Sequence, residues 1–201
     1  SPYFRSRIPF MLNTNLHQVI FVLLSYLVAA IPFGVIIGRI VAGQDVRKQG
    51  SGNIGATNVA RMLGKKWGIF VLLLDAFKGY IVVRSAEAFS DPTFTALIAC
   101  VAVTAHCYPV YLKFKGGKGV ATALGVTLAL STYLVGICLL TFVVVATITR
   151  RISPGSLAAA LSVPIVIFFR PDVLHLGHEL PLWAALFLCV MIWWKHRENI
   201  K

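Results

Sequence analysis

Long apolar runs follow one another along most of this chain, and they constrain its fold more than any other feature. About 20 apolar residues are enough to cross a bilayer as an α-helix, whose backbone groups are satisfied internally. The runs therefore predict an all-α integral membrane protein with about seven transmembrane helices, some short or broken. The expected segments are residues 17–42, 67–84, 93–112, 118–130, 131–149, 155–169 and 181–195.

Composition supports the membrane interpretation. Hydrophobic residues make up 58% of the 201 residues and charged residues 13%, about half the charged fraction of a soluble domain. We expect a single polytopic membrane domain over residues 11–201, preceded by an N-terminal extension at 1–10. The net charge of +12 would suggest nucleic-acid binding in a soluble protein, but here the cations lie at the ends of apolar runs, so no nucleic-acid partner is expected.

One apolar run, residues 118–149, does not fit the simple pattern of one helix for each span. It is too long for a single span at about 1.5 Å per residue, and too short for two full spans. We therefore expect one or both helices to be short, with a break near Gly125 or Ser131.

The positive residues predict the orientation. With seven spans, one side holds nearly all Lys and Arg residues, and the positive-inside rule makes that side cytoplasmic. The amino terminus is then outside, and the segments at 43–66, 113–122 and 150–156 share the cytoplasmic face with the carboxyl terminus. The cations on this side are Arg39, Arg47, Lys48, Arg61, Lys65, Lys66, Lys113, Lys115, Lys118, Arg150, Arg151, Lys195, Arg197 and Lys201.

The loop at 43–66 is unusually rich in glycine and polar residues. Its glycines permit positive φ angles and close approach of backbone N–H groups to a ligand. Arg61 offers a planar fork suited to phosphate. A short helix starting at Asn53 would place Thr57 and Arg61 on one face. The alternative is a tightly packed turn. The candidate ligand-binding residues here are Ser51, Gly52, Asn53, Thr57, Asn58 and Arg61.

Residues 113–122, KFKGGKGVAT, form a second glycine-rich loop that leads into a helix. A helix amino terminus attracts anions, and Lys118 adds a positive charge. Nucleotide binding is weakly supported because the phosphate-loop spacing and a preceding strand are absent. The alternative is a flexible turn with topology-setting lysines. The candidates are Gly116, Gly117, Lys118, Gly119 and Thr122.

The basic carboxyl-terminal stretch 195–200, KHRENI, is the third candidate. His196 and Asn199 are three residues apart, so they share one face of a helix. Histidine can bind phosphate or transfer a proton. The alternative is a frayed basic tail.

Other polar residues lie inside apolar segments. Asp75 and Lys78 are deep in the second segment, where we expect them to pair or to line a polar pocket. His106 is expected to be a satisfied core histidine. The cysteines lack metal-ligand or disulfide spacing, and the cytoplasmic acids are too few for a carboxylate-held metal, so no metal is expected.

The three motifs, in this order and between these segments, resemble those of the bacterial acyl-phosphate:glycerol-3-phosphate acyltransferases, the PlsY family. The matching stretches are SGNIGATNVAR at 51–61, KFKGGKGVAT at 113–122 and HRENI at 196–200. The resemblance extends from about Leu16 to Lys201.

The resemblance implies transfer of a fatty acyl group from acyl phosphate to the 1-hydroxyl of glycerol 3-phosphate. The products would be lysophosphatidic acid and inorganic phosphate, in the first step of phospholipid synthesis. It implies a multi-pass protein of the bacterial inner membrane, in contact with membrane lipids and with an active site facing the cytoplasm. It also implies no cofactor, acyl-CoA or acyl carrier protein.

The resemblance also implies roles for individual residues. Ser51 and Arg61 would act in catalysis and glycerol-3-phosphate binding, the loop around Lys118 would bind acyl phosphate, and His196 and Asn199 would complete the site. The expected substrate-binding residues are Gly52, Asn53, Thr57, Asn58, Gly116, Gly117, Gly119, Thr122 and, in the turn at 150–156, Ser156.

The expected mechanism is direct transfer. Acyl phosphate is already activated, so positioning and charge stabilisation are the main tasks. Ser51 is expected to bind substrate and not to form an acyl-enzyme, because no base lies at local spacing to activate it. The proton of the attacking hydroxyl would pass to His196 or to the substrate phosphate. The alternative function is a membrane transporter of a phosphorylated metabolite.

Overall fold

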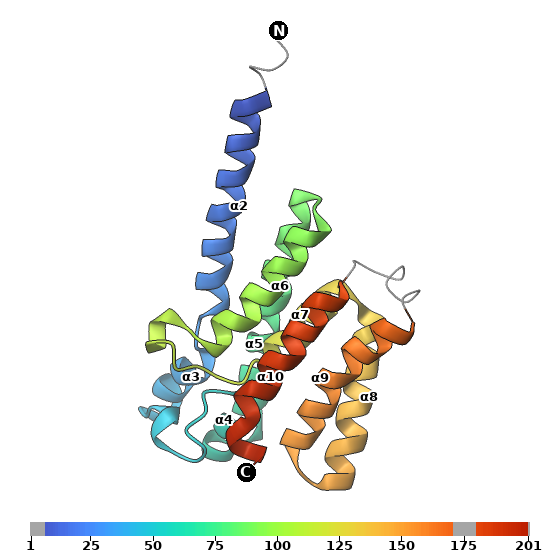
Figure 1. Cartoon of the computed structure of the whole chain (residues 1–201). Coiled ribbons are helices and arrows are strands. Elements are labelled where there is room, and N and C mark those ends of the chain that lie inside the picture. The colour runs from blue at the N-terminus through green and yellow to red at the C-terminus, as the bar shows by residue number, and fades with distance from the viewer. Residues whose placement is uncertain (1–6, 171–179, 201) are drawn as a thin grey trace.

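The computed structural model describes the backbone of residues 7–170 and 180–200, and the side chains of 16–170 and 180–197. Every regular element in this part of the chain is helical, as the apolar runs predicted. The α-helices are α2 (Arg7–Ala29), α3 (Phe33–Ala42), α4 (Ala56–Leu63), α5 (Lys65–Ala86), α6 (Pro92–Cys107), α7 (Val120–Leu130), α8 (Thr132–Thr149), α9 (Ile152–Phe169) and α10 (Leu182–Ile200) (Figure 1). Short 3₁₀ turns occupy Val46–Lys48, Glu87–Phe89 and Val110–Leu112.

The first apolar run is two helices and not the single helix expected over 17–42. Between α2 and α3, Pro32 interrupts the helix because it has no N–H to donate. The carbonyl oxygen of Ile31 at this break accepts a hydrogen bond from Lys78 Nζ, at 2.7 Å. The same carbonyl accepts a hydrogen bond from Phe33 N–H at 3.2 Å, so a lysine of α5 adds a second donor at the break.

The run at 118–149 also breaks, at one of its two expected positions. Ser131 separates α7 from α8 and caps α8, because its hydroxyl accepts a hydrogen bond from Leu134 N–H at 3.3 Å. The 11 residues of α7 extend only about 16 Å. A hydrocarbon core is roughly 30 Å thick, so α7 is too short to cross it.

The expected count of seven full spans is not confirmed. Within the described residues, four segments are long and apolar enough to cross a membrane: Leu16–Ala42, Pro92–Leu112, Thr132–Thr149 and Ile152–Phe169. The remaining three expected segments are helical as well. Of these, α7 is short, α5 carries charged side chains in its middle, and α10 ends in a basic stretch.

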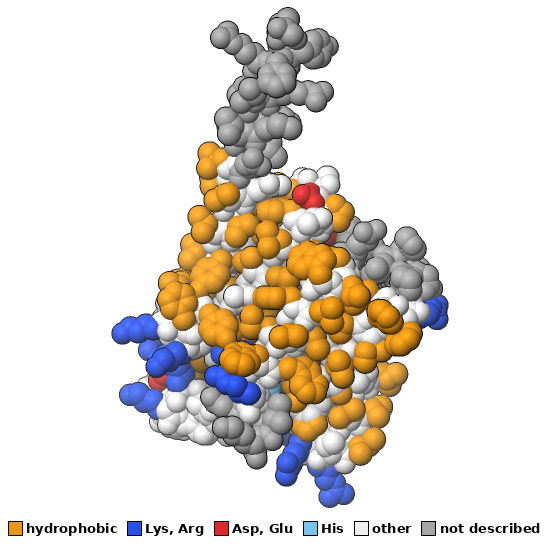
Figure 2. Space-filling model, viewed as in Figure 1, with side chains coloured by type: hydrophobic (Ala, Val, Ile, Leu, Met, Phe, Trp, Pro, Cys, Tyr) orange, Lys and Arg blue, Asp and Glu red, His pale blue; other side chains and the backbone are white. Residues whose placement is uncertain are grey.

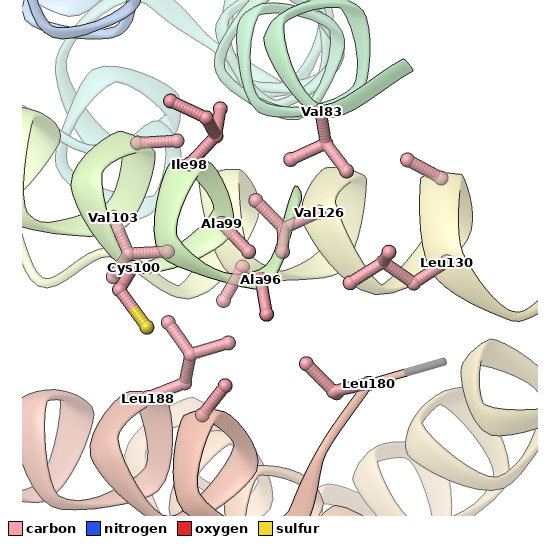
Figure 3. Packing of buried hydrophobic residues seen from close by; sticks show 14 of the residues in the cluster. Val83, Ala96, Ile98, Ala99, Cys100, Val103, Val126, Leu130, Leu180 and Leu188 are labelled. Atoms are coloured by element: carbon pink, nitrogen blue, oxygen red, sulfur yellow. The ribbon is translucent and has the colours of Figure 1, made fainter. Parts of the chain in front are cut away.

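Small residues let the central helices approach closely. A Cβ atom at Gly125 of α7 would overlap the backbone of Ala76 in α5, and one at Gly79 of α5 would overlap the carbonyl of Thr122 in α7. Such close contact through small residues is typical of membrane helices. Figure 3 shows the adjoining core, which includes Val83, Ile98, Ala99, Val126, Leu130 and Leu188.

The polar loops gather at one end of the helical bundle. The 43–66 segment, the α8–α9 turn and the carboxyl-terminal end of α10 lie at the end opposite to the start of α2 (Figure 1). Figure 2 shows Lys and Arg side chains at this same end, beside a broad hydrophobic surface. This arrangement matches the expected grouping of the loops and gives an amphipathic shape suited to a membrane boundary.

Candidate active site

The 43–66 loop is folded around the side chain of Asn58, which is 1% exposed. Its Oδ1 accepts a hydrogen bond from Ser51 N–H at 2.9 Å. Its Nδ2 donates to the carbonyl oxygens of Val46 (2.9 Å), Gln49 (3.2 Å) and Asn53 (2.9 Å). Asn58 therefore holds the loop together. This differs from the expectation that it contacts substrate, because its amide is already committed to the backbone.

Glycine is required beside this amide. Gly50 has a φ of 58°, and a Cβ there would overlap Asn58 Oδ1. Positive φ and lack of space both favour glycine. The next residue, Ser51, is exposed, and its hydroxyl makes no hydrogen bond within the part of the chain that the structure describes. The loop thus fixes the backbone of Ser51 and leaves its hydroxyl available to a ligand.

Helix α4 presents the other polar groups of this loop. Thr57 and Arg61 lie four residues apart in α4, on one face as expected. Arg61 is exposed and Thr57 is half-buried. Asn53 lies before the helix and not within it, contrary to expectation: α4 begins at Ala56, and Asn53 Oδ1 accepts a hydrogen bond from Gly55 N–H at 2.8 Å.

The glycine loop at 113–119 is attached to the end of α6. Gly116 N–H donates to Cys107 O and Gly117 N–H donates to His106 O, both at 3.2 Å. These bonds satisfy carbonyls that the end of a helix leaves unpaired. The expectation that these two amides bind phosphate is therefore not supported, because both already have acceptors.

The loop then leads into α7, as expected. Gly119 caps α7 with a φ of 80°, a left-handed conformation that favours glycine. Thr122, in the first turn, is fully buried, and its hydroxyl has no hydrogen-bond partner among the described residues. The amino terminus of α7 and the charge of Lys118 remain the groups of this loop suited to an anion.

His196 lies one residue beyond the seventh expected segment and is 3% exposed. Its Nδ1 lies 2.8 Å from the carbonyl oxygen of Ile192. A carbonyl can only accept, so Nδ1 carries the proton and Nε2 keeps its lone pair when the ring is neutral. Burial lowers the pKa of His196; the hydrogen bond to Ile192 opposes this shift, and the positive charge of Lys118 adds to it.

Two other expected site residues have different outcomes. Ser156, near the start of α9, is buried, and its hydroxyl donates to Ile152 O at 3.1 Å. Asn199 belongs to α10, three residues after His196, but its side chain lies outside the described residues.

Several contacts bring the motifs together. An apolar cluster joins Val46, Ile54 and Val59 of the first loop to Leu112, which leads into the glycine loop. At the other side of the glycine loop, Lys195 of α10 donates to Cys107 O at 3.2 Å. From the sequence, Lys195 was counted among the cations that set the orientation and not among the site residues. Its position directly before His196 was the one signal that it belongs near the site.

A buried network lies behind the glycine loop. Lys78 Nζ is 2.7 Å from Asp75 Oδ1, and both side chains are 2% exposed, which confirms the expected pair. His106 Nδ1 is 3.6 Å from the same carboxylate oxygen. His106 is buried as expected, yet Nδ1 has no hydrogen-bond partner among the described residues, so it is not the satisfied histidine predicted. Its Nε2 side touches Gly117, where a Cβ would overlap the ring.

Comparison with known proteins agrees with this arrangement. The family model described as glycerol-3-phosphate acyltransferase matches residues 19–201. A protein of that name from Syntrophotalea carbinolica is 42% identical, over 90% of this chain and 91% of its own length. One from Myxococcus xanthus is 47% identical, over 89% of this chain and 92% of its own length.

Solved structures show the same fold. The crystal structure of PlsY (YgiH), an integral membrane glycerol 3-phosphate acyltransferase, in its glycerol 3-phosphate form matches with a TM-score of 0.83. The two chains are 37% identical, and the match covers 92% of this chain and 90% of that one. The lysophosphatidic acid form of PlsY matches with a TM-score of 0.80 and 35% identity. The chain therefore belongs to the glycerol-3-phosphate acyltransferase family of integral membrane proteins.

Proposed function

We propose that this acyltransferase takes its acyl group from an acyl phosphate and passes it to the 1-hydroxyl of glycerol 3-phosphate. The products are lysophosphatidic acid and inorganic phosphate. Both substrates carry a phosphate, so the site needs two anion-binding regions close together. The observation that carries the proposal is that Lys195, directly before the buried His196, donates to the Cys107 carbonyl that also holds the glycine loop, in a bundle end that also holds the Ser51–Arg61 loop.

Glycerol 3-phosphate binds at the first loop. Arg61 is exposed on α4 and offers two parallel N–H donors to its phosphate. The Ser51 hydroxyl, on a backbone fixed by Asn58, bonds an oxygen of the same substrate. Thr57, on the same face of α4 as Arg61, adds a hydroxyl, whereas the Gly52 amide already donates to Gln49 O at 3.0 Å.

The acyl phosphate binds at the second loop. Its phosphate is held by Lys118 and by the backbone amides in the first turn of α7, with Thr122 in that turn. Lys118 neutralises the charge that grows on the phosphate as it leaves. The acyl chain extends from this point along the helices into the bilayer, and the broad hydrophobic surface beside the basic end of the bundle (Figure 2) is suited to contact it.

The chemical step is a direct transfer. The hydroxyl oxygen attacks the acyl carbon, an ester bond forms, and the bond from that carbon to the phosphate oxygen breaks. The hydroxyl proton passes to Nε2 of His196, which the Ile192 hydrogen bond leaves with a lone pair. The proton then goes to the departing phosphate. Asn199, one turn further along α10, orients the attacking substrate.

The site faces the cytoplasm of a bacterial inner membrane. Support for this orientation comes from the cations, which gather at the end of the bundle that holds the three motifs (Figure 2). Cytoplasmic loops carry an excess of Lys and Arg.

Reconstitution of the purified protein in lipid vesicles tests this function. With acyl phosphate and glycerol 3-phosphate, we expect inorganic phosphate and lysophosphatidic acid to appear together. With acyl-CoA or acylated carrier protein as the donor, we expect no product. Absence of phosphate release would exclude the proposed reaction, and counter-flow of labelled glycerol 3-phosphate without chemistry would instead support a transporter.

A further inference from the structure

One backbone carbonyl at the end of α6 holds two parts of the candidate site together. Cys107 O accepts one hydrogen bond from Gly116 N–H and another from Lys195 Nζ, each at 3.2 Å. A carbonyl oxygen has two lone pairs and can accept both bonds. The glycine loop and α10 are therefore attached to the same atom.

Lys195 makes a second contact at the same place. Its ammonium lies 4.6 Å from the centre of the Tyr108 ring, within the range of a cation–π interaction. Tyr108 is itself fixed to α2, since its carbonyl oxygen accepts a hydrogen bond from Tyr26 at 2.6 Å. The half-buried Lys195 thus meets the end of α6 at the point where it is joined to α2.

We propose that Lys195 is a positioning residue that fixes His196 relative to Lys118. It ties the end of α10 to the carbonyl that also holds the glycine loop, and His196 is the next residue along α10. Without the tie, the end of α10 is free to shift against the loop, and a displacement of about 1 Å can cost on the order of 100-fold in rate. This inference rests on the proposed function, because it assumes that His196 and Lys118 act on the substrates.

Substitution of Lys195 tests the proposal, with Lys66 as the matched control. Lys66 also lies over an aromatic ring, Trp67, at 6.0 Å, but makes no hydrogen bond within the described part of the chain. Lys195→Met should lower kcat about 10-fold with little change in the KM for glycerol 3-phosphate. Lys195→Arg should restore kcat to within a few-fold, and Lys66→Met should leave it unchanged.

Two further measurements separate positioning from a general structural role. Lys195→Met should lower kcat much less in a His196→Ala background than in the wild type, because the tie acts through His196. Hydrogen exchange of the amides in 113–122 should rise in Lys195→Met and not in Lys66→Met. An unchanged kcat, equal losses in both backgrounds, or unchanged exchange would each overturn the proposal. A wild-type protein that releases no phosphate would instead contradict the proposed function, and the exchange measurement would still report on the tie.

Discussion

Lys78 lies 2.7 Å from the carboxylate of Asp75 within α5, and it also donates to the carbonyl of Ile31 at the break between α2 and α3. The two buried charges therefore neutralise each other, and Lys78 also stabilises the break between α2 and α3. His106, 3.6 Å from Asp75, connects the pair to Gly117. The charges inside α5 thus support the geometry of the site.

Removal of one partner should be costly. Lys78→Met leaves Asp75 as an uncompensated buried charge, and we expect about 3–5 kcal/mol of destabilisation, measured by unfolding in mixed micelles. The double variant Asp75→Asn/Lys78→Met should be more stable than Lys78→Met, because the lone charge is gone. Arg84→Met breaks a pair of the same spacing on the surface, with Glu87, and should cost less than about 1 kcal/mol. Equal losses in Lys78→Met and Arg84→Met would show that burial of the pair has no consequence.

Asn58 should be more important for stability than its polar neighbour Asn53. Asn58→Asp replaces a donor to three carbonyl oxygens with an acceptor, and we expect about 3 kcal/mol or more of destabilisation with loss of activity. Asn53→Ala removes a single hydrogen bond, to Gly55, and should cost about 1 kcal/mol. Chemical unfolding of both variants makes the comparison. An Asn58→Asp protein with wild-type stability would contradict the assignment of Asn58 to the loop framework.

The contact between Gly117 and His106 predicts a size-dependent effect. In Gly117→Ala the new Cβ overlaps the histidine ring, so the glycine loop should be displaced. Because small displacements of binding groups lower reaction rates strongly, kcat should fall at least about 10-fold. The double variant Gly117→Ala/His106→Ala should recover part of the activity. Gly136→Ala is the control, since nothing lies within 4 Å of the added Cβ. No recovery in the double variant would mean that the ring is not the obstacle.

The lowered pKa of His196 predicts the position of the acid limb of the pH profile. Neutral His196 is the form that accepts a proton, and a pKa below its ordinary value of 6.5 keeps that form populated as the pH falls. The profile of kcat/KM reports the free enzyme, so its acid limb should lie below pH 6.5. The limb should be lost in His196→Ala. If His196→Ala keeps the same limb with a modest fall in kcat, the substrate phosphate and not His196 takes the proton.

Much of the fold was predictable because it follows from local chemistry. Apolar runs marked the helices, and Ser131 marked a break because serine is a good helix cap. The break at Pro32 was missed, although proline interrupts helices, because apolar residues continue on both sides of it. A short helix in this run was expected. That α7 is too short to cross the membrane follows only from its observed start at Val120.

The site was predictable at the level of its motifs and less so for individual side chains. Sequence indicated Asn58 as polar and near Ser51, but its partners are backbone carbonyls whose positions depend on the folded loop. The same reason applies to the amides of Gly116 and Gly117, which bond to the end of α6. The tie from Lys195 joins residues that are 88 positions apart, and no local pattern reports such a contact.

Direct transfer without an acyl-enzyme is the central claim, and rapid-quench measurement of phosphate release tests it most directly. The enzyme is mixed with excess acyl phosphate, with and without glycerol 3-phosphate, and phosphate and protein-bound acyl groups are counted. Direct transfer predicts no burst without glycerol 3-phosphate, and one lysophosphatidic acid for each phosphate when glycerol 3-phosphate is present. A burst of about one phosphate per enzyme without acceptor, with the acyl group attached to Ser51, would contradict it.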